Sequence, residues 1–188
     1  MKARKWAGQT VCVIGSGPSL NAKDCARVEK SGLTTIAVNS SWKMARFCHI
    51  LYAGDLTWWR NCGDEIDIEV EKYTASQNAE HAFSIKRHKS KLGAGYNSGM
   101  LAIELAIHLG ASRVLLLGFD CSVKNGTHWH GDHKNTPNPN KNRCDKWKGY
   151  FQRLADHHKN IEIINCSRET ELLCFPRMTI QDALCGPG

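Results

Sequence analysis

The sequence predicts an α/β protein with a mainly parallel sheet flanked by helices. Short apolar runs recur at 11–14, 34–38, 50–53 and 113–118, and each has the length of one buried strand. The segments between them carry helical patterns, and parallel strands that alternate with helices are joined by right-handed crossovers. The chain has 188 residues, the usual length of one domain, so we expect 1–188 to form a single domain.

In the first half of the chain, each expected strand is followed by a helix. A helix is predicted from about Asn21 to Lys30, before Ser31-Gly32. The β-branched run 34–38 is typical of a strand. After the strand at 50–53, we expect a helix over Leu56–Asn61.

The polar region at 64–91 is harder to interpret. Ile66, Ile68 and Val70 alternate with acidic residues, which predicts a half-exposed strand over 66–70. We expect a further strand at 82–85.

The second half has the clearest helix and the clearest strand. The segment 97–110 is apolar on most of its circumference and ends at Gly110, a natural helix C-cap. No polar residue interrupts 114–117, so the strand 113–118 should be central in a parallel sheet.

A long loop and three more elements complete the chain. The loop 119–143 is rich in Asn, Gly, Pro and His, and loops of this length are usually functional or mobile. We expect an amphipathic helix over 144–158, a strand over 161–164 and a short helix over 179–184.

Composition excludes several classes of protein. Hydrophobic residues make up 41% and charged residues 23%, which is ordinary for a globular chain. The longest apolar run, 114–118, is too short for a membrane span, and residues 1–9 lack the apolar region of a secretory signal.

The net charge of +7 favours anionic ligands, but it is spread thinly, which argues against nucleic acid as a partner. Nine cysteines without a CxxC pair indicate reduced thiols and a cytoplasmic location, not a zinc ribbon.

The residues that follow the expected strands point to a binding site. Ligands of open α/β sheets bind beyond the carboxyl ends of the strands, at the topological switch point. Small or hydrogen-bonding residues follow five of the expected strands. They are Gly15, Ser16, Gly17, Pro18 and Ser19 after the first, Asn39 and Ser40 after the second, Asp55 after the third, Asp120 after the strand at 113–118, and Asn165 after the last. We therefore expect a Rossmann-like nucleotide-binding domain.

Two of these segments suit a nucleotide. The glycines of Gly15–Ser19 would let the backbone approach a phosphate at a helix start, although the loop matches neither GxGxxG nor the Walker A pattern. A plain tight turn is the alternative. Asn39 suits a contact to a base or ribose, and an Asx turn is its alternative.

The loop also concentrates three histidines within six residues. His128, His130 and His133 could bind a divalent metal ion with Cys144 as a fourth ligand. Catalysis or substrate binding is the interpretation that we favour, and a polar surface loop is the other alternative. Trp58-Trp59 are more typical of core packing than of a sugar platform.

Several motifs together resemble a known enzyme family. Val13-Ile14-Gly15-Ser16-Gly17-Pro18-Ser19-Leu20 is similar to the opening of the bacterial sialyltransferases of glycosyltransferase family forty-two. It also resembles the related flagellin-glycosylation proteins and the hydroxymethylpterin pyrophosphokinases. Asn97-Ser98-Gly99 before a helix, the segment Arg113–Asp120 and Asn165-Cys166-Ser167 continue the resemblance, which extends to phage-encoded proteins of this length.

The resemblance implies a CMP-sugar type of donor and a transfer to an acceptor hydroxyl without a metal ion or other cofactor. Ser98 and Gly99, with Asn97 before them, would help to hold the nucleotide. His133 would be the general base, a role suited to an imidazole near neutral pH, with His128 and His130 in support.

The sequence departs from the family at three positions. Ser122 and Trp129 stand where the family has tyrosines that support the departing phosphate, and Asp55 stands where the sialyltransferases have Asn. Two alternatives therefore stay open. One is a pyrophosphokinase-like transferase that uses ATP and Mg²⁺, held by Asp55 or Asp120; the other is a protein that only sequesters a nucleotide. The sequence does not indicate an oligomeric state.

Overall fold

The computed structural model describes residues 4–92, 97–133 and 137–185 of the chain. All strands of the sheet run parallel, in the order β5-β4-β3-β2-β1-β6-β7. The strands are β1 (Thr10–Ile14), β2 (Thr34–Val38), β3 (Ile50–Tyr52), β4 (Glu71–Thr74), β5 (Lys86–Arg87), β6 (Arg113–Leu117) and β7 (Glu162–Asn165). The helices are α1 (Ala22–Ser31), α2 (Leu56–Cys62), α3 (Gln77–Phe83), α4 (Ser98–Leu109), α5 (Lys141–His157) and α6 (Ile180–Cys185). The predicted Rossmann-like α/β fold is confirmed.

The strand order places the topological switch point between β1 and β6. From β1 the chain builds outward through β2, β3 and β4 to β5, and then returns through α4 to place β6 on the other side of β1. The register of this central pair sets Thr10 opposite Arg113 and Ile14 opposite Leu117. Ligands of such sheets bind at this crevice, so the strand order alone indicates where a site should lie.

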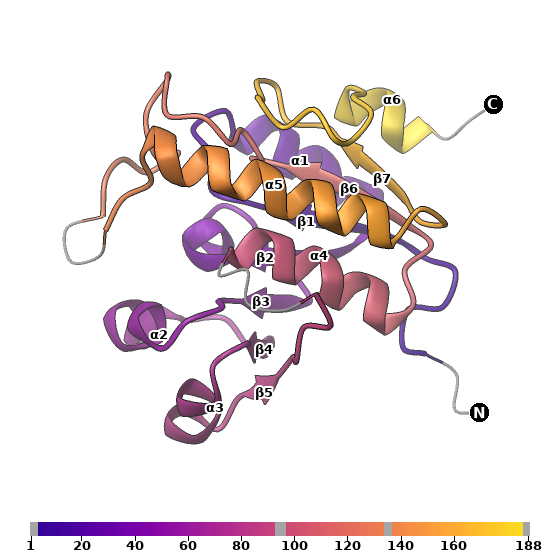
Figure 1. Cartoon of the computed structure of the whole chain (residues 1–188). Helices are drawn as coiled ribbons and strands as arrows, with labels where there is room; N and C mark the ends of the chain where they lie inside the picture. Colours follow the sequence, from indigo (N-terminus) through magenta and orange to yellow (C-terminus); the bar gives the residue numbers. More distant parts are fainter. Residues whose placement is uncertain (1–3, 93–96, 134–136, 186–188) are drawn as a thin grey trace.

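Alternation along each strand divides the core into two layers. In β1, Val11 and Val13 belong to the cluster that contains α4 and α5, whereas Cys12 and Ile14 belong to the cluster that contains α1 and α6. Figure 1 shows α4 and α5 across the near face of the sheet and α1 behind it. A parallel sheet covered on both faces needs apolar residues at every position of its central strands, which explains the uninterrupted apolar runs.

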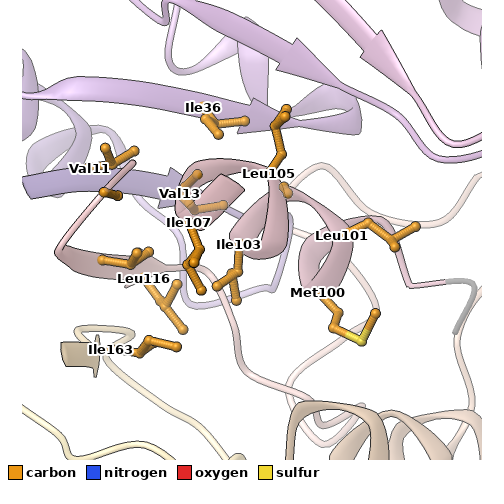
Figure 2. Packing of buried hydrophobic residues seen from close by; sticks show 14 of the residues in the cluster. Val11, Val13, Ile36, Met100, Leu101, Ile103, Leu105, Ile107, Leu116 and Ile163 are labelled. Atoms are coloured by element: carbon orange, nitrogen blue, oxygen red, sulfur yellow. The ribbon is translucent and has the colours of Figure 1, made fainter. Parts of the chain in front are cut away.

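Helix α4 fills the centre of one layer. Ile103 and Leu105 are 0% and 1% exposed, and burying such a side chain contributes about 1.5–3 kcal/mol. Figure 2 shows these residues beside side chains from the strands. The helix begins after Asn97, whose side chain accepts a hydrogen bond from the Met100 amide, and ends at Gly110, which has a φ of 112°. The predicted boundaries of this helix are confirmed to within one residue.

The two strands expected in the polar region are wrong. The segment 66–70 forms no strand; the side chains of Ile66, Ile68 and Val70 are partly buried against the core, so their alternation reflects packing without strand pairing. Pairing with β3 begins only at Glu71. The segment 82–85 lies at the end of α3, because Ser76 caps a helix that continues to Phe83.

The long loop and α5 also differ from expectation. Helix α5 begins at Lys141 rather than at Cys144, because the Asn140 side chain accepts a hydrogen bond from the Arg143 amide. The last strand and the C-terminal helix lie within one or two residues of their predicted positions. No helix in the described parts of the chain is long and apolar enough to cross a membrane.

Candidate nucleotide-binding site

A cavity of about 610 Å³ lies at the carboxyl ends of the central strands. Its wall includes the loop after β1, the first residue after β2, Asp55 after β3 and the segment 118–122 after β6. The start of α4 and one side of α5 supply further parts of the wall. The volume falls within the range of small-molecule and cofactor sites, about 300–1,000 Å³.

Most of the residues singled out from the sequence are brought together in this wall. Those that line the cavity are Gly15, Ser16, Gly17, Pro18, Asn39, Asp55, Asn97, Ser98, Gly99, Asp120, Ser122, His128, His133 and Cys144. Those that the structure places outside the lining are Ser19, Ser40, His130 and Asn165. These motifs, which are far apart in the sequence, therefore lie around one cavity. Their contacts with a ligand stay predictions.

The glycine loop after β1 is bound tightly to the end of β6. The Gly15 amide donates to Leu117 O at 2.7 Å, and the Gly17 amide donates to Gly118 O at 2.8 Å. The Ser19 amide and hydroxyl both donate to the Asp120 carboxylate, at 2.8 and 2.7 Å. These amides are therefore engaged within the protein, in contrast to the open phosphate cradle that the glycines suggested.

The same contact explains why two glycines are required. A Cβ atom on Gly17 would lie 2.2 Å from Asp120 Oδ1, and one on Gly15 would lie 2.7 Å from Gly118 O. Burial raises the pKa of Asp120, although the hydrogen bonds from Ser19 oppose the shift. Asp120 thus holds the loop in place.

The residues at the end of β3 and at the start of α4 also form hydrogen bonds that connect neighbouring elements of the cavity wall. The Asp55 carboxylate accepts a hydrogen bond from the Trp58 amide at 2.8 Å and caps α2. Ser98 Oγ accepts a hydrogen bond from the Gly54 amide at 3.0 Å, which ties α4 to the end of β3. Gly99 lines the cavity in the first turn of α4, where the helix dipole favours an anion.

Asn39 combines a left-handed backbone conformation with an unpaired polar atom. Its φ is 51°, in the left-handed region that asparagine adopts more readily than most residues other than glycine. Its Oδ1 atom is buried, and no group that the structure describes donates a hydrogen bond to it. Buried acceptors are normally paired, so an unpaired one in a residue that lines the cavity marks Asn39 as a candidate contact for a ligand that reaches this side chain.

Ser40 and Asn165, in contrast, are buried in the protein and do not line the cavity. Ser40 is buried within the short turn Asn39–Lys43. Asn165 is fully buried; its side chain accepts a hydrogen bond from the Ser167 amide at 3.0 Å and donates one to Thr170 Oγ1 at 3.1 Å. Asn165 therefore shapes the turn after β7 and does not reach the cavity.

Helix α5 contributes a set of side chains that the sequence analysis did not single out. Arg143, Lys146, Trp147 and Tyr150 line the cavity, and their spacing of three and four residues places them on one side of the helix. Neither Arg143 nor Lys146 forms an ion pair with another described residue. Recognising Asn140 as the N-cap would have extended the predicted helix far enough to include Arg143.

Three histidines from the long loop face one another beside the cavity. One ring nitrogen from each of His128, His130 and His133 lies within 4.8 Å of the others. The rings of His128 and His130 are stacked, with centroids 5.1 Å apart. Cys144 lines the cavity but does not belong to this group, so the predicted fourth ligand is not in place.

The surroundings of these rings favour their neutral forms. Burial, together with His133 and His130, lowers the pKa of His128 to about 4. Burial also lowers the pKa of His130, with further contributions from His133 and Lys43. The pKa of His133 is lowered by burial, which the nearby Asp132 opposes. At neutral pH all three rings are therefore uncharged, and each has one unprotonated nitrogen.

The paired tryptophans after Asp55 belong mainly to the core, as expected. Trp58 and Trp59 are 4% and 2% exposed. The Trp59 indole donates to Ala53 O at 2.9 Å. Trp58 also lines the cavity, and its indole N–H is buried without a hydrogen-bond partner among the described groups.

Comparison with solved structures finds a protein of similar fold. The chain is similar to the MAf glycosyltransferase from Magnetospirillum magneticum AMB-1, with a TM-score of 0.61, 12% sequence identity and 94% of this chain covered. The match spans only 34% of that protein. A weaker match, with a TM-score of 0.36 and 13% identity, is a UDP-glucose 4-epimerase from Thermotoga maritima, over 83% of this chain and 54% of that one. No protein-family model and no curated protein matches the sequence. The chain thus has a glycosyltransferase-like fold.

Proposed function

We propose that this protein binds a nucleotide-activated donor of the CMP-sugar type and transfers its activated group to an acceptor hydroxyl. The observation that carries the proposal is the cavity at the switch point, where the strand ends, the start of α4 and the basic side of α5 meet. The similarity of fold to a glycosyltransferase supports it.

The charges of the wall suit the phosphate of such a donor. Arg143 and Lys146 bring two cations to the cavity, and the first turn of α4 adds the positive end of a helix dipole. The two carboxylates in the wall, Asp55 and Asp120, are occupied as acceptors from the Trp58 amide and from Ser19. The phosphate therefore belongs near α4 and α5, and Asn39 would contact the nucleoside.

The histidines supply a base for the acceptor. His133 lines the cavity, and its lowered pKa keeps the ring uncharged near pH 7. In the metal-free protein, the His133 ring accepts the proton of the acceptor hydroxyl as the hydroxyl oxygen attacks the donor. The bond from the sugar carbon to the phosphate oxygen breaks, and the nucleotide leaves with that electron pair. Tyr150 adds a phenol to the same cavity, although it lies on α5 rather than in the loop.

The proposal predicts nucleotide binding that depends on α5. Isothermal titration calorimetry with CMP, CDP, UDP, GDP and a pterin should detect at least one ligand, with a cytidine nucleotide the tightest. Lys146→Ala should weaken binding by about tenfold, since hydrogen bonds to charged groups contribute about 1.5–3 kcal/mol. Lys141→Ala is the matched control on the same helix, because Lys141 is exposed and pairs with Asp145 outside the cavity. Absence of binding to every ligand, or equal losses in both variants, would refute the proposal.

The alternatives give different outcomes in the same preparation. A pyrophosphokinase-like transferase would require ATP and Mg²⁺ and would lose all activity in EDTA, whereas the proposed transfer should continue. Tight nucleotide binding without turnover of any nucleotide sugar would identify a sequestering protein.

A further inference from the structure

We infer that His128, His130 and His133 form a binding site for one divalent transition-metal ion of the zinc type, open toward the cavity. Their ring nitrogens already lie within 4.8 Å of one another. Three nitrogens bound to one tetrahedral zinc ion at about 2.0–2.1 Å lie about 3.3 Å apart. The rings of His128 and His130 are stacked with their planes 9° apart, so at least one of them must turn about its side-chain bonds before both lone pairs point at one ion.

The backbone of the loop is arranged to gather the three rings. The Trp129 amide donates to Ser16 O at 3.1 Å, which fixes the loop to the glycine segment. The Gly131 amide donates to His128 O at 3.1 Å and closes a turn, with a φ of 81° at Gly131. This turn brings His130 back beside His128.

A second clamp holds the third histidine. The Asn138 side chain accepts a hydrogen bond from the His133 amide at 2.8 Å and donates one to His133 O at 3.1 Å. Asn138 therefore fixes both backbone groups of His133. The three ring centroids are 4.6 to 5.1 Å apart as a result.

One histidine also has the outer partner that metal-binding imidazoles use. Ser16 Oγ lies 3.2 Å from His128 Nδ1, within hydrogen-bond distance. With Nε2 as the ligating atom, Nδ1 would be the second nitrogen, which a ligating histidine usually engages in a hydrogen bond that fixes the orientation of the ring. Through Ser16, the site is connected directly to the glycine loop of the cavity.

The donor set selects the class of ion. Three imidazoles suit zinc, cobalt, nickel or copper ions, whereas Mg²⁺ and Ca²⁺ prefer oxygen ligands. His128 and His133 both line the cavity, so a fourth position would face the bound substrates. Three protein ligands and one open position are characteristic of catalytic rather than structural zinc sites.

The inference extends the proposed function without depending on it, because metal binding is measured without a donor. An ion at this site would engage the lone pair that His133 uses as a base in the metal-free protein. An acceptor hydroxyl bound to the ion would then lose its proton to solvent more readily, as metal-bound water does.

Titration of the metal-free protein with Co²⁺, followed by visible absorption, tests the site. We expect one equivalent to bind with the intense bands of tetrahedral cobalt and without a thiolate charge-transfer band, which separates this site from the nine cysteines. Zn²⁺ should displace the cobalt. His130→Ala should weaken binding by about 100-fold or more, since even the outer partners of ligating histidines contribute about 10–100-fold.

Two further variants keep the test decisive. His130→Gln preserves the size of the side chain if the alanine variant folds poorly, which far-ultraviolet circular dichroism would show, and it should lose cobalt binding equally. His81→Ala removes an exposed histidine of α3 and should leave binding unchanged. Absence of cobalt binding, a thiolate band, or equal affinity in His130→Gln and wild type would overturn the inference. Nucleotide calorimetry in EDTA reports on the proposed function separately.

Discussion

The polar side chains of the cavity wall fall into two groups. Some form hydrogen bonds within the protein, and others have no partner among the described residues. Asp55, Ser98 and Asp120 have their hydrogen bonds within the protein. Asn39 has an unpaired Oδ1, and Lys146 has no ion-pair partner among the described residues. The polar groups that bond within the protein hold the wall of the cavity in place, and those without a partner are the candidates for contacts with a ligand.

At this scale, His133 provides the sharpest test of the transfer reaction. His133→Ala should lower turnover of the donor identified by calorimetry by about 10²–10⁴-fold, the usual contribution of a positioned base. The affinity for the donor should change little, because a group that contacts the acceptor does not hold the nucleotide. The assay is run in EDTA, so that loss of a metal ion does not contribute. His81→Ala, outside the cavity, serves as the control.

Two results would contradict the assignment of His133. Unchanged turnover would remove it from the reaction, and a parallel fall in donor affinity would make it part of the nucleotide site. Rescue of turnover by added imidazole would support its role as a base.

At the scale of elements, the tight contact between the loops after β1 and β6 predicts opposite effects on stability for two glycine-to-alanine substitutions, at Gly17 and at Gly149. Gly17→Ala would place Cβ 2.2 Å from Asp120 Oδ1 and 2.7 Å from Gly118 O, and overpacking of this kind costs about 1–3 kcal/mol. Gly149 lies inside α5 with nothing within 4 Å of an added Cβ. Gly149→Ala should therefore stabilise the protein by about 0.5–1 kcal/mol through helix propensity.

Urea unfolding monitored by circular dichroism would compare the two glycine variants with wild type. Gly17→Ala should also weaken nucleotide binding, since the loop forms part of the cavity wall, while Gly149→Ala should not. Equal stability of Gly17→Ala and wild type would show that the two loops separate easily.

The elements also show which parts of the fold can be predicted from sequence patterns. The central strands and α4 were predictable because burial on both faces demands uninterrupted apolar residues. Strand β4 has the sequence Glu-Lys-Tyr-Thr, and a polar strand near the edge of a sheet carries no such pattern. The segment 66–70 shows the reverse, since its alternation arises from packing alone.

The same limits apply to the candidate site. Residues directly after strands could be placed together from topology, because parallel strands deliver their ends to one edge of the sheet. The basic side of α5 could not be placed, since it depends on where a long loop returns to the sheet. The clustering of the three histidines depends on the turn at Gly131 and the clamp by Asn138, which are contacts of the folded chain.

At the scale of the whole molecule, an ion pair between a buried carboxylate, Asp24, and an exposed guanidinium, Arg168, joins the first helix to the segment after the last strand. Asp24 in α1 is 3% exposed and accepts hydrogen bonds from Arg168 Nε and Nη2 at 2.6 and 3.0 Å. Arg168 follows β7, so the contact links α1 to the segment beyond the last strand. Asn21 and Arg27 donate to the same carboxylate, at 2.9 and 2.8 Å.

This ion pair predicts how stability depends on pH. Burial alone raises the pKa of Asp24, but the hydrogen bonds from Arg168, Asn21 and Arg27 outweigh it and hold the pKa below its ordinary value of 3.8. The folded state thus binds a proton less readily than the unfolded state. The stability that the carboxylate contributes is therefore complete above pH 3.8 and is lost as the pH falls through the lower folded-state pKa.

Asp24→Asn should accordingly destabilise the protein at pH 7, and the difference from wild type should shrink as the pH falls below 3.8, because protonated aspartate resembles asparagine. Thermal unfolding of both proteins across this range measures the difference. Asp67→Asn is the matched control: Asp67 pairs with Arg46 on the surface, where their side chains are 65% and 54% exposed, and such pairs contribute little. The difference in stability between Asp24→Asn and wild type could instead stay constant with pH. That result would show that the amide destabilises the protein for steric reasons and that the charge on Asp24 does not stabilise the contact between α1 and Arg168.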